Sequence, residues 1–219
     1  TKLQTEHFFK NVKRQRIIHN GTSIPVITQQ KELTFKTMGV KYDSFIISVI
    51  GDIGGVKRPQ LVIELAEKLT TIKDLFFVFI GDGNEREEII NICKNRNLNN
   101  IIFIEPTSEI GNFINASSLV ISMAYVEGFG RTLIEAMALS KPVMAFNNGG
   151  PKEIILNNFN GFLIEEGNIE EYAQKIRLLV CDKEKALSIG ENGYKRFLEF
   201  FSSEKYTEEY LKEYTSILT

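Results

Sequence analysis

The sequence predicts an α/β domain, from about residue 41 to residue 182, in which helices cover both faces of a parallel sheet. Short apolar runs alternate with amphipathic segments along this region. A short continuous apolar run is typical of a strand that is buried on both faces. Strands that alternate with helices favour right-handed βαβ units, and ligands of such sheets bind at the carboxyl ends of the strands.

Six apolar runs are predicted to be the strands of this sheet. They are FIISVIG (45–51), LFFVFIG (75–81), IIFIE (101–105), SLVISM (118–123), PVMAF (142–146) and GFLI (161–164).

Helices are predicted in the gaps between these runs. Pro59 suits the first turn of a helix, and apolar residues follow it at helical spacing. Asn84 with Glu87, and Asn168 with Glu171, each resemble a capping box at the start of a helix.

The two ends of the chain differ from this alternating region. Residues 1–40 are mostly polar and are predicted to be a lead-in segment from an N-terminal domain outside this chain. Residues 183–219 are predicted to be two helices that pack on the domain or on that other half. The second helix carries Tyr206, Tyr210 and Tyr214 at helical spacing, which is usually a packing stripe.

The composition excludes several classes of protein. Hydrophobic residues make up 43% and charged residues 25% of the 219 residues, as in ordinary soluble domains. A net charge of −2 argues against nucleic-acid binding. Cys93 and Cys181 are far apart, which predicts neither a disulfide nor a zinc site and favours a reducing cytoplasm. We expect a cytoplasmic protein, peripheral at most on the inner face of the membrane, and nothing in this segment indicates membrane contact.

The stretch 125–155 carries the strongest chemical signal. A glycine-containing loop leads into a helix that is predicted to start near Arg131, and such a helix start binds anions through free amides and the helix dipole. Glu127 and Glu135 flank this loop, with seven residues between them. Carboxylates tolerate a phosphate nearby when they accept hydrogen bonds from hydroxyls. The pattern therefore predicts a phosphorylated, polyhydroxylated ligand.

The block EGFGRTLIEAMALSKPV (127–143) resembles the signature of glycosyltransferase family 4. Further resemblance lies in IIHNGTSIP, VIGDIGGVKRPQLVIELAEKL, IGDGNEREEI and NNGGPKEIILNNFNGFLI, so that nearly all of residues 17–218 are covered. The resemblance implies a Rossmann-like fold that forms the C-terminal, donor-binding half of a two-domain GT-B enzyme.

The resemblance also implies roles for individual residues. Glu127 would contact hydroxyls of the donor sugar, and Lys57 would stabilise charge on the diphosphate leaving group. Glu135 would accept hydrogen bonds from the nucleotide ribose. The remaining donor-binding residues are Gly128, Phe129 and Gly130 around the sugar, Arg131, Thr132 and Leu133 at the helix start, Gly54 and Gly55 after the first strand, and Pro106 and Thr107 beside the base.

The activity that the resemblance implies is that of a retaining hexosyltransferase. It would move a sugar from a UDP- or GDP-linked donor to a glycan or lipid-linked acceptor hydroxyl, in the synthesis of cell-surface glycans or glycolipids. The acceptor would bind mainly to the N-terminal domain, so this chain alone is expected to be an incomplete enzyme. No cofactor and no metal are expected. Two alternatives remain open, a GT-B-shaped nucleotide-sugar epimerase and a non-catalytic nucleotide-sugar-binding module.

One position departs from the family pattern. Many relatives carry an arginine after the glycine of the first strand, as a second phosphate cation, and this sequence has Asp52 there. Arg58 follows Lys57 and is expected to point to one side, because adjacent helix residues do not share a face. Arg131 is the substitute cation that the sequence offers.

Overall fold

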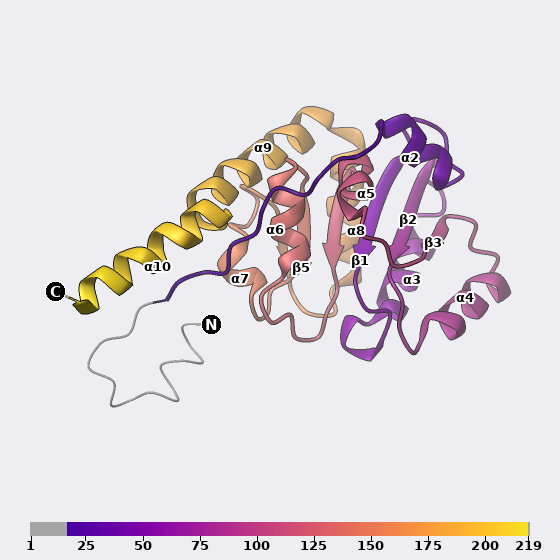
Figure 1. Cartoon of the computed structure of the whole chain (residues 1–219). Helices are drawn as coiled ribbons and strands as arrows, with labels where there is room; N and C mark the ends of the chain where they lie inside the picture. The colour runs from indigo at the N-terminus through magenta and orange to yellow at the C-terminus, as the bar shows by residue number, and fades with distance from the viewer. Residues whose placement is uncertain (1–16, 219) are drawn as a thin grey trace.

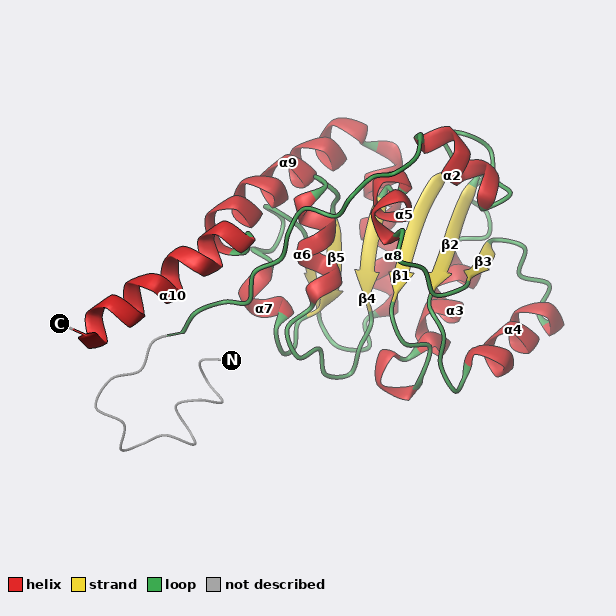
Figure 2. Ribbon diagram, viewed as in Figure 1, coloured by secondary structure: helices red, strands yellow, loops and turns green. Residues whose placement is uncertain are grey.

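The predicted sheet is present, and all of its strands run parallel (Figures 1 and 2). The computed structural model describes residues 17–218, with side chains as far as residue 216. Its six strands match the six predicted runs and are β1 (Phe45–Ile50), β2 (Leu75–Ile80), β3 (Ile101–Ile104), β4 (Leu119–Ser122), β5 (Val143–Phe146) and β6 (Phe162–Ile164).

The order of the strands is β3-β2-β1-β4-β5-β6. β1 pairs with β2 on one side and with β4 on the other, so the chain reverses its direction of winding between β1 and β4. In a doubly wound sheet this reversal opens a crevice at the carboxyl ends of the two strands, where ligands bind. The crevice here lies beyond Ile50 and Ser122, the last residues of β1 and β4.

Helices cover both faces of the sheet, which confirms the doubly wound α/β prediction. One face packs against α3 (Pro59–Lys68), α4 (Arg86–Asn95) and α8 (Ile169–Cys181). The other packs against α2 (Lys31–Thr37), α5 (Ile110–Ala116) and α6 (Arg131–Ala138). Neighbouring strand residues such as Ile46 and Ile47 enter opposite cores. Both faces are therefore buried, which explains the continuous apolar runs.

The C-terminal region forms the two predicted helices, α9 (Lys183–Phe200) and α10 (Ser203–Leu218). α9 packs closely on α6 and on the turn after it: a Cβ on Gly193 would lie 3.2 Å from Met137 Cγ, and one on Gly190 would lie 2.1 Å from the carbonyl oxygen of Ser140. α10 extends beyond the sheet (Figure 1), and the ring of Tyr214 is largely exposed. No helix in the described part of the chain is both long enough and apolar enough to cross a bilayer.

The predicted lead-in segment is more structured than the sequence suggested. Residues 1–16 lie outside the described part of the chain, whereas the rest of the segment crosses α6 from α10 to α2 (Figure 1). The backbone amide of Thr22 donates to Phe201 O at 2.9 Å, and that of Thr28 to Asn112 Oδ1 at 2.8 Å. Helix α2 was not predicted, and it buries Phe35 in the core beneath α5.

Of the two predicted capping boxes, one is correct and one is wrong. Asn168 caps α8, since its Oδ1 accepts from the amide of Glu171 at 3.1 Å. α4 instead begins at Arg86, without a side-chain cap. The reason is that the amide of Glu85 is bonded to Ile53 O in the β1 loop, which holds residues 83–85 in a turn and delays the helix.

Candidate functional site

Two predicted site residues meet at the crevice between β1 and β4. Lys57 ends the 3₁₀ turn η1 (Gly55–Lys57) after β1, and Glu127 lies in the loop between β4 and α6. Lys57 Nζ is 2.6 Å from Glu127 Oε2, and the hydroxyl of Ser122 donates to the same oxygen at 3.0 Å. The side chains of Lys57 and Glu127 are 28% and 13% exposed, so the pair is partly desolvated but open on one side.

This pairing has a chemical consequence for ligand binding. A carboxylate that accepts two hydrogen bonds is held in one position, and a charge-assisted bond is stronger than a neutral one. Lys57 is therefore already oriented at the crevice, with Glu127 as its partner. An anionic ligand that takes Lys57 must compete with Glu127 or share the ammonium group with it.

The glycine loop delivers free amides to the same crevice. Gly130 has a φ of 95°, a left-handed conformation that suits glycine, and α6 begins at the next residue. Within the described residues the amides of Arg131 and Thr132 have no acceptor, as expected at a helix start without a side-chain cap. The amide of Leu133 is already bonded to Gly130 O at 3.0 Å. Of the three amides predicted to face a diphosphate, those of Arg131 and Thr132 therefore remain available to a ligand.

Gly149 and Gly150, which follow β5, pack against the backbone of this loop. The amide of Gly150 donates to Glu127 O at 2.9 Å. A Cβ on Gly149, whose φ is 49°, would lie 2.2 Å from Glu127 O, and one on Gly150 would lie 2.4 Å from Phe129 O. Only glycine permits so close an approach, so this pair fixes the backbone on which Glu127 stands.

Glu135 and Arg131 lie one turn apart on α6. Arg131 Nη2 is 3.6 Å from Glu135 Oε1, and the arginine side chain is 77% exposed while the glutamate is 14% exposed. Burial raises the pKa of the Glu135 carboxyl, and the charge of Arg131 partly offsets that effect. Arg131 thus has a carboxylate partner here, and no contact joins it to Lys57.

Gly54 and Gly55 lie where the β1 loop meets the β2 loop. A Cβ on Gly54 would come within 2.5 Å of Asp52 Oδ2 and 2.7 Å of Asn84 Oδ1. Asp52 is exposed and its carboxylate lies against Gly54, so it adds negative charge beside the crevice. The amide of Lys57 donates to Gly54 O at 2.9 Å, which shapes the turn that carries the lysine.

Pro106 and Thr107 lie farther away along the same edge of the sheet. They follow β3, the edge strand, which is separated from β1 by β2. Two strand spacings amount to about 10 Å. The hydroxyl oxygen of Thr107 accepts from the amide of Glu109 at 3.0 Å. The structure therefore does not bring these two residues into contact with the Lys57–Glu127 pair.

Arg58 points away from the crevice, as the sequence predicted. Its φ is 51°, its Nε donates to Met123 O at 3.1 Å, and its Nη1 lies 3.1 Å from Glu166 Oε1. The guanidinium carbon is 4.9 Å from the ring centroid of Phe146. Arg58 thus ties the β1 loop to the end of β4.

Sequence reasoning missed two contributors to the site. Ser122 is the polar residue in the buried strand β4, and this position at the carboxyl end of a strand could have identified it. Its carbonyl accepts from the buried Tyr172 hydroxyl at 2.9 Å. His19 lies beside Phe129, with ring centroids 6.4 Å apart, and its Nδ1 is 3.6 Å from Glu153 Oε2. Phe129 itself packs partly into the core.

The described residues contain no group of three or more His, Cys, Asp or Glu side chains placed to hold a metal ion. Cys93 and Cys181 are both free thiols, as the sequence indicated.

Known proteins are similar to this chain in sequence and in fold. The family model described as Glycosyl transferases group 1 matches residues 30–196. The poly(ribitol-phosphate) alpha-N-acetylglucosaminyltransferase of Staphylococcus aureus is 33% identical over 175 residues, which are 78% of this chain and 35% of that protein.

Solved structures give the same result. A glycosyltransferase from Rickettsia africae matches with a TM-score of 0.87 at 26% identity. The match covers 100% of this chain and 62% of the Rickettsia chain. A variant of S. aureus TarM in complex with fondaparinux, alpha-GlcNAc-glycerol and UDP has a TM-score of 0.81 at 27% identity, over 97% of this chain and 42% of that one.

The chain spans about half the length of the curated relatives it matches, with 54%, 35% and 48% of three of them covered. The family model nevertheless covers most of the 219 residues. The chain therefore belongs to the glycosyl transferases group 1 family.

Proposed function

We propose that this chain is the donor-binding half of a retaining, family 4 glycosyltransferase. The enzyme transfers a hexose from a nucleotide diphosphate sugar to an acceptor hydroxyl in the synthesis of cell-surface glycans, in the cytoplasm or at its membrane face. The observation that carries the proposal is the meeting of Lys57 and Glu127 beside the free amides of α6, at the crevice where doubly wound sheets bind ligands.

The positive charge for the diphosphate comes from two sources in this proposal. The amides of Arg131 and Thr132 lie at the positive end of the α6 dipole and bind phosphate oxygens. Lys57 binds the same group from the β1 side. Negative charge grows on the diphosphate as the glycosidic bond breaks, and a cation fixed at that position stabilises the transition state more than the ground state.

The two carboxylates serve hydroxyl groups of the donor. When the diphosphate binds Lys57, the Glu127 carboxylate loses its ion pair with the lysine and accepts hydrogen bonds from the sugar hydroxyls instead. The hydrogen bond from the Ser122 hydroxyl holds the carboxylate at the crevice during this exchange. Glu135, one turn farther along α6, accepts from the ribose. Pro106 and Thr107 border the base at the far end of the crevice. The proposal involves no metal ion, because Lys57 and the helix start supply the charge.

The relatives support a proposal for the donor and the acceptor of the enzyme. UDP is bound in the TarM complex, which supports a UDP-linked donor here, with GDP as the other base to test. A poly(ribitol-phosphate) transferase among the relatives supports a glycan acceptor. Because the relatives are about twice as long as this chain, we assign acceptor binding mainly to a further domain.

A non-catalytic nucleotide-sugar-binding module is a second candidate, and Asp52 favours it. An acidic side chain at this loop weakens the positive potential that a diphosphate needs. Family membership favours a transferase over a module of this kind and over an epimerase.

Calorimetry of the chain with UDP and GDP, followed by donor hydrolysis and transfer assays on the full-length protein, tests the proposal. Saturable binding of one nucleotide, with transfer that retains the anomeric configuration, supports it. Binding without hydrolysis or transfer supports the module, an epimerised donor supports the epimerase, and no binding of either nucleotide contradicts all three.

A further inference from the structure

A second pocket lies at the amino ends of the strands, whereas the Lys57–Glu127 crevice lies at their carboxyl ends. It has a volume of about 420 Å³ and lies at the amino ends of β1, β4 and β5, where Phe45, Ser118 and Pro142 line it. β1 is six residues long, which separates the two edges of the sheet by about 20 Å. The pocket is therefore not part of the donor crevice.

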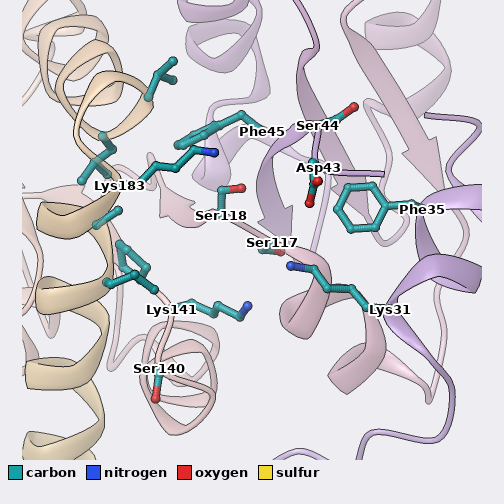
Figure 3. A pocket seen from close by; sticks show the side chains of 15 residues that line it. Lys31, Phe35, Asp43, Ser44, Phe45, Ser117, Ser118, Ser140, Lys141 and Lys183 are labelled. Atoms are coloured by element: carbon teal, nitrogen blue, oxygen red, sulfur yellow. The ribbon is translucent and has the colours of Figure 1, made fainter. Parts of the chain in front are cut away.

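Three lysines from three different elements line this pocket. Lys31 begins α2, Lys141 lies between α6 and β5, and Lys183 begins α9. Figure 3 shows their side chains reaching toward the pocket from different sides. Among the described residues that line the pocket, Asp43 is the one acidic residue. No ion pair joins Asp43 to any of the three lysines. The pocket wall thus carries three ammonium groups against one carboxylate.

Lys141 is the most deeply placed of the three. Its Nζ donates to Asn115 O at 2.6 Å, which satisfies one of its three N–H groups. Burial, followed by the charge of Lys31, lowers the pKa of Lys141 to about 8. Two ammonium groups that disfavour each other in a half-buried space would both be stabilised by a bound anion.

The hydroxyl of Ser118 completes the polar side of the pocket. Its oxygen accepts from the amide of Ile46 at 3.3 Å, and its hydrogen has no acceptor among the described residues. In Figure 3 this oxygen lies between Lys183 and Lys141. A hydroxyl held in this way donates to an oxygen atom placed between the lysines.

The other wall of the pocket is apolar. Leu179 and Val180 come from the end of α8, and Leu187 from the first turns of α9. An inorganic ion leaves this wall in contact with water, whereas a ligand with an anionic end and an apolar body covers it.

We propose that this pocket binds a phosphate monoester that carries an apolar body, at a site separate from the donor crevice. Lys31, Lys141 and Lys183 contact the phosphate oxygens as point charges, Ser118 donates to one of them, and the α8–α9 wall holds the body. Such a phosphate belongs either to a free metabolite or to a lipid headgroup.

The test uses phenyl phosphate as the probe on this 219-residue chain, with binding followed by calorimetry in a phosphate-free buffer. We expect saturable binding that Lys141→Met and Lys183→Met each weaken at least tenfold. Lys94→Met removes an exposed lysine on α4 and is the matched control, with unchanged affinity expected. Saturating UDP or GDP should leave the affinity for phenyl phosphate unchanged. Lys183 is exposed, so this variant keeps the test valid if Lys141→Met does not fold.

Phosphatidylcholine vesicles with and without phosphatidic acid distinguish the two sources of the phosphate. Cosedimentation that needs phosphatidic acid and is lost in Lys183→Met supports a lipid headgroup. Binding of phenyl phosphate without cosedimentation supports a free metabolite. The proposal is overturned if phenyl phosphate does not bind, if both lysine variants bind as the wild type does, or if a nucleotide competes with it.

Discussion

Replacing Glu127 by glutamine should strengthen the binding of the nucleoside diphosphate, although it removes a residue proposed to act in transfer. In the structure Lys57 Nζ lies 2.6 Å from Glu127 Oε2. A diphosphate must draw the lysine from that carboxylate and also approach the carboxylate's negative charge. Glutamine keeps the shape and a hydrogen-bond acceptor for Ser122, but it removes both of these costs.

The magnitude follows from the strength of the pair. A hydrogen bond to a charged group contributes about 1.5–3 kcal/mol. The pair is partly exposed, and Lys57 has three donors with which to contact both partners, so about half of that value is regained. We expect a gain of about 0.7–1.4 kcal/mol, which is a roughly three- to tenfold tighter Kd for UDP or GDP.

Calorimetry on the chain measures this change directly. Glu170→Gln removes the same charge from an exposed carboxylate on α8 that pairs with Lys68, and its affinity should equal that of the wild type. Weaker or unchanged nucleotide binding by Glu127→Gln, with Glu170→Gln unchanged, would refute the idea that Glu127 and the diphosphate compete for Lys57.

Three further predictions concern the loop and helix α6. Gly149→Ala should lower the free energy of unfolding by about 2–3 kcal/mol, because the new Cβ would lie 2.2 Å from Glu127 O. Gly167 also has a positive φ but has open space around it, so Gly167→Ala should lower the free energy of unfolding by only about 1–2 kcal/mol. Equal decreases for the two variants in denaturant unfolding would contradict this. Glu135→Ala should weaken nucleotide binding by about 1–3 kcal/mol, and an unchanged affinity in titrations of the folded variant would leave Glu135 a structural role. Burial raises the folded-state pKa of Glu135, so ionisation of this carboxyl destabilises the fold as pH rises above the ordinary glutamate range. Glu135→Gln should therefore be more stable than the wild type at pH 7, and the difference in stability should vanish below about pH 4. Thermal unfolding of both proteins across that pH range checks the sign.

The sheet could be predicted from the sequence because each strand is buried on both faces. Residues 75–80 are apolar at every position and residues 45–50 at every position except Ser48, a pattern typical of a short strand that is buried on both faces. Helix α2 could not be predicted in the same way. Its seven residues bury Thr34 and Phe35, and what stabilises them is contact with α5, about 80 residues away in the sequence.

The site was predictable as separate residues and not as an arrangement. The sequence singled out Lys57 and Glu127 individually, but their ion pair joins positions 70 residues apart and depends on β1 and β4 being neighbours. The same holds for Lys31, Lys141 and Lys183, which follow no sequence pattern and come together only because α2, the residue before Pro142 and the start of α9 all lie at the amino ends of the strands.

The measurement that tests the central claim most directly is an amide-resolved NMR titration of the chain with UDP and with GDP. If the chain binds the donor as proposed, one nucleotide should produce saturable shifts that are largest for the free amides of Arg131 and Thr132, with smaller shifts from Gly54 to Lys57. Saturable shifts confined to another part of the chain, or none with either nucleotide, would contradict the claim.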